Sequence, residues 1–450
     1  MKSHPPDASI VDRLYNGLFD EDENTRVCKD IPEDACTNVA HNFFIHLITK
    51  VATKTGDALS SPRLVVSWLL AGLGVSPALI GLIVPVREAG SLLPQLAIGG
   101  AVRRLPIRKW VWIGGSVLQG AAVLGMAAAA LTLRGATAGW VIVALVAFFA
   151  VSRGVCSVTG KDLVGKTVPK TRRGRLSGLA ASIAGVVALV VGGTIALVGP
   201  DTLSIRILAG IITVAGGMWL AAAVVMTFLA ETPGATSGGG NALMVALRSL
   251  RLLSRDRMFR RFVVARALLA STVLSMPFYV LLTRDATGDR ASTLGLFIVA
   301  SSLATAVSGF AWGRFADRSS RWSMVVAGAA ASIAGVLVFV FRAVVDPPGG
   351  ALQSGGGGET VPVYIALYFV LALSHTGIRV SRKTYLVDMA PADERASYVA
   401  VSNTVIGVVL LFSGSLGILG SFLSPHEVVL VFAALGLVGS AVAATLKEVE

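Results

Sequence analysis

The chain has 450 residues, of which 54% are hydrophobic and 14% charged, with 49 glycines and a mean hydropathy of +0.74. These values exclude an ordinary soluble globular protein and predict an integral, multi-pass membrane protein that contacts the lipid bilayer. The formal net charge is +13, which in a soluble protein would favour nucleic-acid binding. Here the Lys and Arg residues cluster in short loops, as the positive-inside rule requires, so we expect no nucleic-acid partner.

Residues 1–40 lack an apolar core and include an acidic run, Asp20, Glu21, Asp22 and Glu23. This composition argues against a secretory signal and predicts an acidic, solvated cytosolic tail. Three cysteines, Cys28, Cys36 and Cys156, form no paired framework, so disulfides are not expected. The histidines and cysteines match no compact metal template either, and we expect neither a metal site nor a cofactor.

Twelve apolar stretches follow, each compatible with the roughly 20 residues that a spanning helix needs. We expect helices at 42–71, 77–101, 110–132, 139–165, 175–198, 205–230, 258–283, 291–313, 322–345, 361–385, 396–422 and 426–446. Basic loops alternate with loops that are sparse in charge, which predicts cytosolic termini in a bacterial inner membrane. An alternative for the start is a first span at 64–85, with residues 39–60 lying on the membrane surface.

The second half of the chain repeats the first. Residues 79–83 at the start of the second helix correspond to residues 293–297 at the start of the eighth, and Pro169 and Arg173 correspond to Pro391 and Arg395. This repeat predicts two pseudo-symmetric six-helix bundles, residues 41–230 and 258–450. Residues 231–257 would form a cytosolic linker whose Gly-rich start is flexible.

Two loop strings are similar to those of a known family. Residues 313–321, Gly-Arg-Phe-Ala-Asp-Arg-Ser-Ser-Arg, lie between two apolar stretches and are expected to form a tight turn. They resemble the loop signature of the major facilitator superfamily of secondary transporters. Residues 168–175, Val-Pro-Lys-Thr-Arg-Arg-Gly-Arg, resemble the link between its fourth and fifth helices. The resemblance covers nearly all of the chain after residue 40. It implies an all-α fold of twelve transmembrane helices in two bundles related by an axis along the membrane normal, and a monomeric transporter rather than an enzyme.

The resemblance also implies a gate. In the superfamily the loop aspartate pairs with basic groups at neighbouring helix ends and holds the cytosolic side shut, so Asp317 would pair with Arg382 or Lys383. Arg318 and Arg321 belong to the same loop. The alternative is that these groups only anchor the loop in water, where an exposed pair contributes under about 1 kcal/mol.

The loop after the second helix departs from the family pattern. Arg103 stands where the aspartate is expected and Pro106 where the second glycine is expected. Either the usual carboxylate contact is missing from this half or it is inverted, with Arg103 or Arg104 meeting Asp162 at the end of the fourth helix.

Several charged residues lie inside the predicted helices: Lys50, Lys54, Asp57, Arg87, Glu88 and Arg153. A charge at the centre of a bilayer costs about 2.5–3.5 kcal/mol or more, so such a cluster needs partners or a hydrated cavity. At about 1.5 Å of rise per residue, Asp57 and Arg87 reach the same depth and are expected to pair. The cluster either locks the helices together or lines a site for substrate and protons.

The positive charges in this cluster outnumber the negative ones, which favours an anionic substrate. His375, which the repeat aligns with Arg153, is a candidate for proton coupling, and the second half is otherwise expected to supply an apolar wall. The sequence therefore predicts a transporter of a small organic anion that works by proton-coupled alternating access. An efflux antiporter remains open, although Gly192 and Gly193 lack the proline of the antiporter motif. A receptor or assembly factor on the same fold also remains open.

Overall fold

The computed structural model describes residues 15, 37–95, 98, 101–102, 104–199, 201–234, 250–345, 360–391 and 394–449. Almost all of these residues are helical, and within this part the only β pairing is one isolated bridge between Thr202 and Arg290. Ten of the helices described there are long and apolar enough to cross a membrane. They correspond to the third to twelfth predicted helices, and the predicted all-α membrane fold is confirmed.

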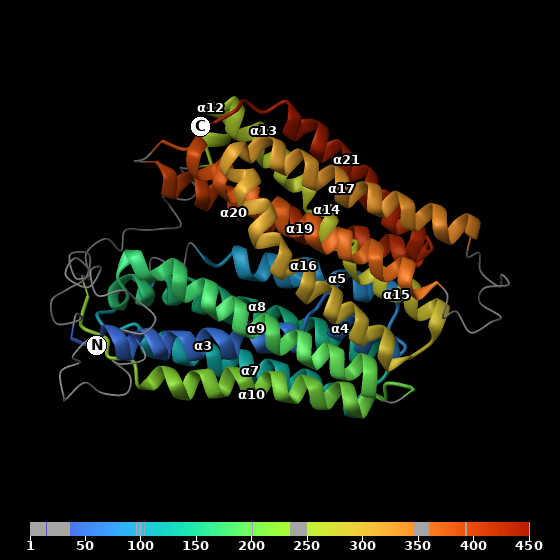
Figure 1. Cartoon of the computed structure of the whole chain (residues 1–450), viewed down its shortest axis with the longest axis horizontal. Helices are drawn as coiled ribbons and strands as arrows, with labels where there is room; N and C mark the ends of the chain where they lie inside the picture. The colour runs from blue at the N-terminus through green and yellow to red at the C-terminus, as the bar shows by residue number, and fades with distance from the viewer. Residues whose placement is uncertain are drawn as a thin grey trace, which may run out of the picture.

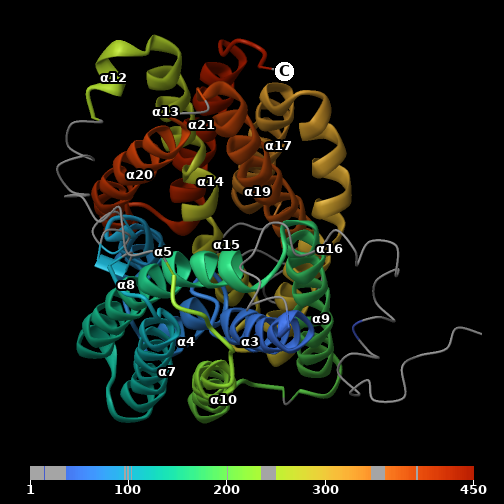
Figure 2. The same ribbon diagram turned by 90° about the vertical axis from the view of Figure 1, so that its left-hand side faces the viewer.

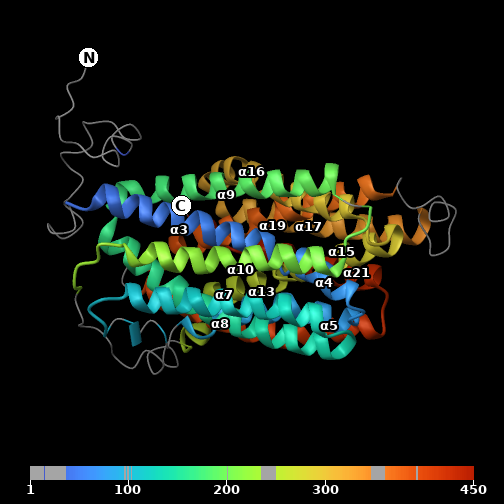
Figure 3. The same cartoon turned by 90° about the horizontal axis from the view of Figure 1, so that it is seen from below.

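The helices of the first half run nearly parallel to one another (Figures 1 and 3). Within this group α7 packs against α8 and α10, α3 against α9 and α10, and α5 against α8. The bounds are α3 (Val39–Leu59), α4 (Val65–Gly72), α5 (Pro77–Leu92), α7 (Lys109–Thr132), α8 (Gly135–Thr167), α9 (Lys170–Val198) and α10 (Ile205–Thr227). The first predicted span appears here as α3 and α4, and the second as α5.

The second half forms a matching group. Here α17 packs against α19 and α21, α16 against α19, and α13 against α21. The bounds are α12 (Leu252–Arg255), α13 (Arg257–Leu269), α14 (Ser271–Leu274), α15 (Met276–Thr287), α16 (Ala291–Arg318), α17 (Ser320–Val340), α19 (Val361–Met389), α20 (Arg395–Gly417) and α21 (Pro425–Ala444). A π-helical turn, Phe341–Val345, follows α17, and a 3₁₀ turn, Ile418–Ser421, follows α20.

The start of α3 and the end of α21 lie at the same end of the molecule (Figure 1), which we call the terminal side, and the opposite end is the far side. Figure 2 views the molecule from the terminal side and separates the two groups of helices. Most of the expected tail and linker, including residues 235–249, lies outside the described residues. Of the tail before residue 37, only Tyr15 is described, with its ring 5.5 Å from that of Phe43.

The outer faces of the helices are apolar. Val186 and Val190 of α9 are 59% and 61% exposed, and Val224 of α10 is 61% exposed. A soluble protein rarely exposes so much contiguous apolar surface, whereas the lipid tails of a bilayer cover it without cost. The outer helices therefore bury one face inside their bundle and present another to lipid, whereas α14 is buried on all sides.

The two bundles meet mainly along two equivalent helix pairs, α9 with α16 and α20 with α5. A Cβ at Gly192 of α9 would lie 2.8 Å from Ile298, and a Cβ at Gly414 of α20 would lie 3.1 Å from Leu82. Gly192 and Gly414 are separated by the same offset as Pro169 and Pro391, so the internal repeat recurs in the packing. Glycine permits this close approach because it lacks a side chain. On the far side the N–H of Leu203 donates to the carbonyl of Asp289 at 2.8 Å.

Three predicted helices are interrupted. The first breaks at residues 60–64 because Pro62 has no N–H to donate and disfavours the helical conformation in the residue before it. Pro94 likewise interrupts the second predicted helix, because α5 ends at Leu92 while the described residues 95, 98, 101 and 102 are again helical. In the seventh predicted helix, Pro277 follows a boundary at Ser275 that separates α14 from α15.

The predicted turn at residues 313–321 is wrong in its extent. The α16 helix continues to Arg318, so Gly313 and Asp317 are helical, and only Ser319 lies between α16 and α17. The Ser319 side chain accepts a hydrogen bond from the N–H of Trp322 at 3.0 Å and so caps α17.

Candidate functional site

Three charged residues in the first bundle form one ion cluster. The Asp57 carboxylate on α3 accepts a hydrogen bond from Arg87 of α5 at 2.8 Å and another from Arg153 of α8 at 2.7 Å. The second nitrogen of Arg153 lies 2.5 Å from the other Asp57 oxygen, so this arginine binds in the two-pronged manner that guanidinium groups favour. The predicted pairing of Asp57 with Arg87 is confirmed, and Arg153 completes it.

Aromatic side chains pack behind this cluster. The Arg87 guanidinium lies 5.3 Å from the centre of the Phe149 ring, a cation–π contact. Phe149 meets Trp219 edge to face at 5.1 Å, and Trp219 packs on Gly56, where a Cβ would approach the indole to 2.8 Å. The Asp57 cluster is therefore held in place by the buried core that joins α3, α8 and α10.

A second ion pair lies at the break in the first span. Arg63, between α3 and α4, donates to Glu88 of α5 at 3.0 Å, and the two side chains are 25% and 28% exposed. The sequence prediction missed Arg63 because it treated 42–71 as one helix. Pro62 was the available signal, since a proline inside a helical pattern marks a break. Lys54, another charged residue of the predicted cluster, lies within electrostatic reach of Asp57, Arg153 and Arg379.

The second bundle faces this region with cations rather than with an apolar wall, so that prediction is wrong. Arg379 and Arg382 lie three residues apart on α19, and both act electrostatically on Glu88 and Arg63 across the bundle interface. His375, one turn earlier, is buried with Nδ1 3.4 Å from the Thr272 hydroxyl. It lies in the field of Arg63 and of both α19 arginines.

Solvent reaches the space between the bundles. Lys54, five residues before the end of α3, and Arg379, in the second half of α19, interact electrostatically with one another across the interface, and both are exposed. Their exposed surface therefore faces the opposite bundle rather than lipid. The charged residues that interact around this space in the described part of the chain are Lys50, Lys54, Arg63, Arg87, Arg153, Lys161, Arg266, Arg379, Arg382 and Lys383, with Asp57 and Glu88 as counter-charges.

Arg266 of α13 is a buried cation with neutral partners. Its guanidinium donates to the Ser402 hydroxyl at 2.5 Å and to the Asn403 side-chain oxygen at 2.9 Å, both on α20, and its side chain is buried. Among the described residues no carboxylate pairs with it. A buried charge without a counter-ion is costly in a membrane protein, and such residues tend to mark functional sites.

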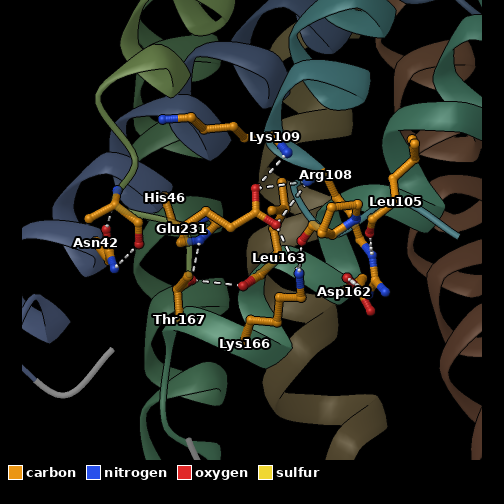
Figure 4. A network of polar contacts seen from close by, with 12 residues as sticks. Asn42, His46, Leu105, Arg108, Lys109, Asp162, Leu163, Lys166, Thr167 and Glu231 are labelled. Atoms are coloured by element: carbon orange, nitrogen blue, oxygen red, sulfur yellow. Dashed lines mark hydrogen bonds and ion pairs between the residues drawn. The ribbon is translucent and has the colours of Figure 1, made fainter. Parts of the chain in front are cut away.

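A separate polar network joins helix ends within the first bundle on the terminal side (Figure 4). Glu231, whose side chain is fully buried, accepts hydrogen bonds from the backbone N–H groups of Arg108 and Lys109 at the start of α7, at 2.9 and 2.7 Å. Lys166 at the end of α8 donates to the same carboxylate at 2.9 Å. A carboxylate at a helix N-terminus is favourable because it binds free N–H groups at the positive end of the helix dipole.

The predicted gating residues lie on this same side. Asp162 pairs with Arg108, rather than with Arg104, and Arg103 lies outside the described residues. Asp317 and Arg318 are exposed at the end of α16, and Asp317 forms no ion pair with any described residue. Its expected partner Arg382 instead faces Glu88.

Arg321 is tied to the end of the chain. It pairs with Glu448 at 2.8 Å and donates to the Leu446 carbonyl at 3.0 Å. It therefore fixes the segment after α21 against the start of α17.

Comparison with known families gives one result. The family model described as Major Facilitator Superfamily matches residues 51–352 and 276–450. The chain belongs to this superfamily. It is thus an integral, multi-pass membrane protein, and the resemblance noted in its two loop strings is confirmed. Comparison with curated proteins gives no match.

Solved transporters share the fold of this superfamily member at low identity. The inward-open structure of the xylose transporter XylE from E. coli aligns with a TM-score of 0.66 and 13% identity, covering 90% of this chain and 97% of that one. The nucleoside transporter NupG aligns with a TM-score of 0.66 and 13% identity, covering 90% and 100%. A POT family transporter in complex with 5-aminolevulinic acid aligns with a TM-score of 0.65 and 11% identity, covering 89% and 95%.

Proposed function

We propose that this protein is a secondary active transporter that moves a small organic anion across a bacterial inner membrane by proton-coupled alternating access. Membership of the superfamily supports transport. Both described ends of the chain lie on the terminal side, where Arg251, Arg255 and Arg257 add exposed positive charge. This charge supports a cytosolic terminal side.

The excess of cations between the bundles supports an anionic substrate. Ten cationic side chains and two carboxylates interact there among the described residues. Two unit charges 4 Å apart attract by about 4 kcal/mol at an effective dielectric constant of 20. An anion that reaches this space therefore gains attraction from both bundles, while a cationic drug is repelled.

The packing between the bundles supports a rocking cycle. The close contacts between the bundles include the far-side hydrogen bond from the Leu203 N–H to the Asp289 carbonyl and the contact of Gly192 with Ile298. Opening this side and closing the terminal side would expose the cations to the opposite face of the membrane. In that second state Asp317, with Arg318 beside it, would pair with a basic residue of α19 and act as the proposed gate. The pair of Asp162 with Arg108 would keep the helix ends of the first bundle together.

A transport assay with purified protein tests this function. Proteoliposomes with an imposed pH gradient would be offered a panel of labelled carboxylates and phosphate esters, with cationic dyes as the contrasting class. We expect uptake of at least one anion that depends on the gradient, and the sign of that dependence separates symport from antiport. Exclusion of every anion together with transport of dyes would favour an efflux antiporter. No movement of any compound would favour a receptor or assembly factor.

A matched pair of variants tests the site itself. Arg379→Gln removes an exposed cation from the space between the bundles, and Arg206→Gln removes an exposed cation from the far side. Hydrogen bonds to charged groups contribute about 1.5–3 kcal/mol, so Arg379→Gln should weaken anion uptake about 10- to 100-fold. Arg206→Gln should leave uptake unchanged. Equal effects of the two variants would contradict a substrate site at Arg379.

Labelling of single cysteines tests the orientation. In a cysteine-free background, Ser254→Cys on the terminal side and Thr137→Cys on the far side place thiols at exposed positions. A membrane-impermeant reagent should label only the second in intact cells. Labelling of the first from outside would reverse the proposed topology.

A further inference from the structure

Two lysines interact across the bundle interface near the terminal side. Lys161 of α8 belongs to the first bundle and Lys383 of α19 to the second, and Lys161 acts electrostatically on Lys383. Each lies six residues before the end of its helix, which at about 1.5 Å of rise per residue places both about 9 Å from the terminal end. Lys161 and Lys383 are separated by the same offset as Pro169 and Pro391. The internal repeat therefore makes them equivalent residues of the two bundles.

This lysine pair has no counter-ion in the described part of the chain. The charged groups that act on Lys383 are all cations: Lys161, Arg266, Arg379 and Arg382. Both lysines are exposed, and neither forms a hydrogen bond or an ion pair with a described residue. Like charges repel more strongly as they approach each other and as the water between them is excluded. The pair therefore opposes any movement that brings the terminal ends of the two bundles together.

Carboxylates close to these lysines in the fold do not bridge the bundles. Asp162, the neighbour of Lys161 in the sequence, pairs with Arg108 inside the first bundle. Asp317 lies on α16, which belongs to the same bundle as Lys383, so a pair between them would leave Lys161 uncompensated. Among the described residues the negative charge needed between the bundles is therefore missing, and an anion from outside the chain can supply it.

Arg266 adds a fixed positive charge beside the lysine pair. Its guanidinium is buried and donates to Ser402 and Asn403 of α20 at 2.5 and 2.9 Å, and its Nε has no hydrogen-bond partner among the described residues. It acts on Lys383 without any carboxylate to weaken its field. A phosphate-type oxyanion carries up to two negative charges and several acceptor oxygens. It can therefore accept hydrogen bonds from both lysines while Arg266 attracts it from its buried position.

We propose that Lys161 and Lys383 hold one phosphate-type oxyanion between them, on the axis that relates the two bundles, and that this anion allows the terminal side to close. Binding of the anion does not depend on the proposed function, whereas its closing role rests on the proposed rocking cycle. Each ammonium group donates to a different oxygen, so the repulsion between the lysines is replaced by attraction to a shared ligand. When the anion leaves, the lysines repel each other again and the terminal side opens. Free phosphate and the phosphate of a lipid headgroup share this chemistry.

Calorimetric titration with inorganic phosphate tests the site. The protein is purified in a neutral detergent without phospholipid, and chloride keeps the ionic strength constant. Lys383→Gln and Lys161→Gln should each weaken phosphate binding about tenfold or more, because each removes a hydrogen bond between charged groups. Lys383→Arg should retain binding. Both lysines are exposed, so these variants should fold, which size-exclusion chromatography checks.

Lys447→Gln is the matched control for Lys383→Gln. Lys447 is an exposed lysine that follows α21 on the same side of the molecule. Its backbone carbonyl accepts from Tyr385, which points about 200° away from Lys383 around α19. Phosphate binding by Lys447→Gln should equal that of the wild-type protein. Equal weakening by Lys447→Gln and Lys383→Gln would overturn the site, because it would show only a general effect of surface charge.

Spin labels on the terminal side test closure. Thr171→Cys in the first bundle and Ser254→Cys in the second, in a cysteine-free background, place labels at exposed positions. The distance between the labels, measured by pulsed electron paramagnetic resonance, should shorten when phosphate is added and stay unchanged in Lys383→Gln. Shortening in phosphatidylglycerol nanodiscs without free phosphate, but not in phosphatidylcholine nanodiscs, would assign the site to a lipid headgroup.

The two experiments separate the two parts of the proposal. Phosphate binding without a shorter distance would overturn the closing role and retain the site. A wild-type protein that closes equally without phosphate and without phosphatidylglycerol would also overturn the closing role, because its own chain would then supply the charge. If phosphate does not bind and phosphatidylglycerol has no effect, both parts are wrong, whatever the transport assays show.

Discussion

Replacing Asp57 by Asn should test whether the ion cluster of the first bundle is a structural lock. The amide keeps one oxygen that can accept a hydrogen bond, but it loses the charge that compensates Arg87 and Arg153. These two guanidinium groups would then repel each other with no carboxylate in contact with both. The effect should appear as a loss of stability rather than as a change in substrate preference.

The expected loss of stability depends on how exposed the side chains of Arg87 and Arg153 are. Removing one partner of a buried pair typically costs about 3–5 kcal/mol. The Arg87 side chain is 15% exposed and that of Arg153 is 33% exposed, so water compensates Arg153 better. We therefore expect Asp57→Asn to cost about 3 kcal/mol, and Arg153→Gln, which leaves Asp57 bound to Arg87, to cost about 1 kcal/mol. The double variant Asp57→Asn with Arg87→Gln should recover about 2 kcal/mol relative to Asp57→Asn.

Thermal unfolding in detergent micelles, followed by tryptophan fluorescence, measures these differences, and exchange of the labelled anion that the wild-type protein takes up best measures function. The double variant should unfold at a higher temperature than Asp57→Asn alone, and it should regain exchange because a purely structural pair takes no part in transport. A double variant less stable than the single one would refute the pairing argument. A stable double variant without exchange would instead mean that Asp57 or Arg87 takes part in transport.

Three further changes have defined outcomes. Glu231→Gln should lower the free energy of unfolding by about 1–3 kcal/mol, because a neutral acceptor replaces the buried carboxylate at the start of α7; unchanged thermal unfolding would contradict that role. Gly295→Val should open the far side, because a side chain there would strike the backbone of Ala196, and modification of Thr202→Cys from that side should become faster. Asp317→Asn should slow anion uptake at equal protein levels, and equal rates would argue against a gate.

The sequence alone predicted correctly those features that a single physical rule controls. Hydropathy located the helices because lipid requires long apolar segments. Depth arithmetic paired Asp57 with Arg87 because rise per residue is nearly constant in a helix. The pairing of Arg63 was not predicted because residues 42–71 were treated as one continuous helix, although Pro62 lies within them.

Other features depend on tertiary packing. Arg379 and Arg382 face the first bundle because of how α19 is rotated about its own axis. Successive residues of a helix point about 100° apart around that axis, so the rotation decides which of them face the neighbouring bundle. A small rotation would have turned them toward lipid or toward α16. The role of Glu231 was equally hidden, because it binds the start of a helix more than 120 residues earlier in the chain. Local capping patterns cannot reveal such a partner.

Carboxylates anchor both ends of the segment that joins the bundles. Glu231 is fixed to α7 and α8, while Asp256 accepts from the N–H groups of Met258 and Phe259 and from the Tyr398 hydroxyl at 2.8 Å. Residues 235–249 between them could span at most about 3.3–3.6 Å each. The fully extended length of the chain between Glu231 and Asp256 therefore sets an upper limit on how far the terminal sides of the two bundles can move apart.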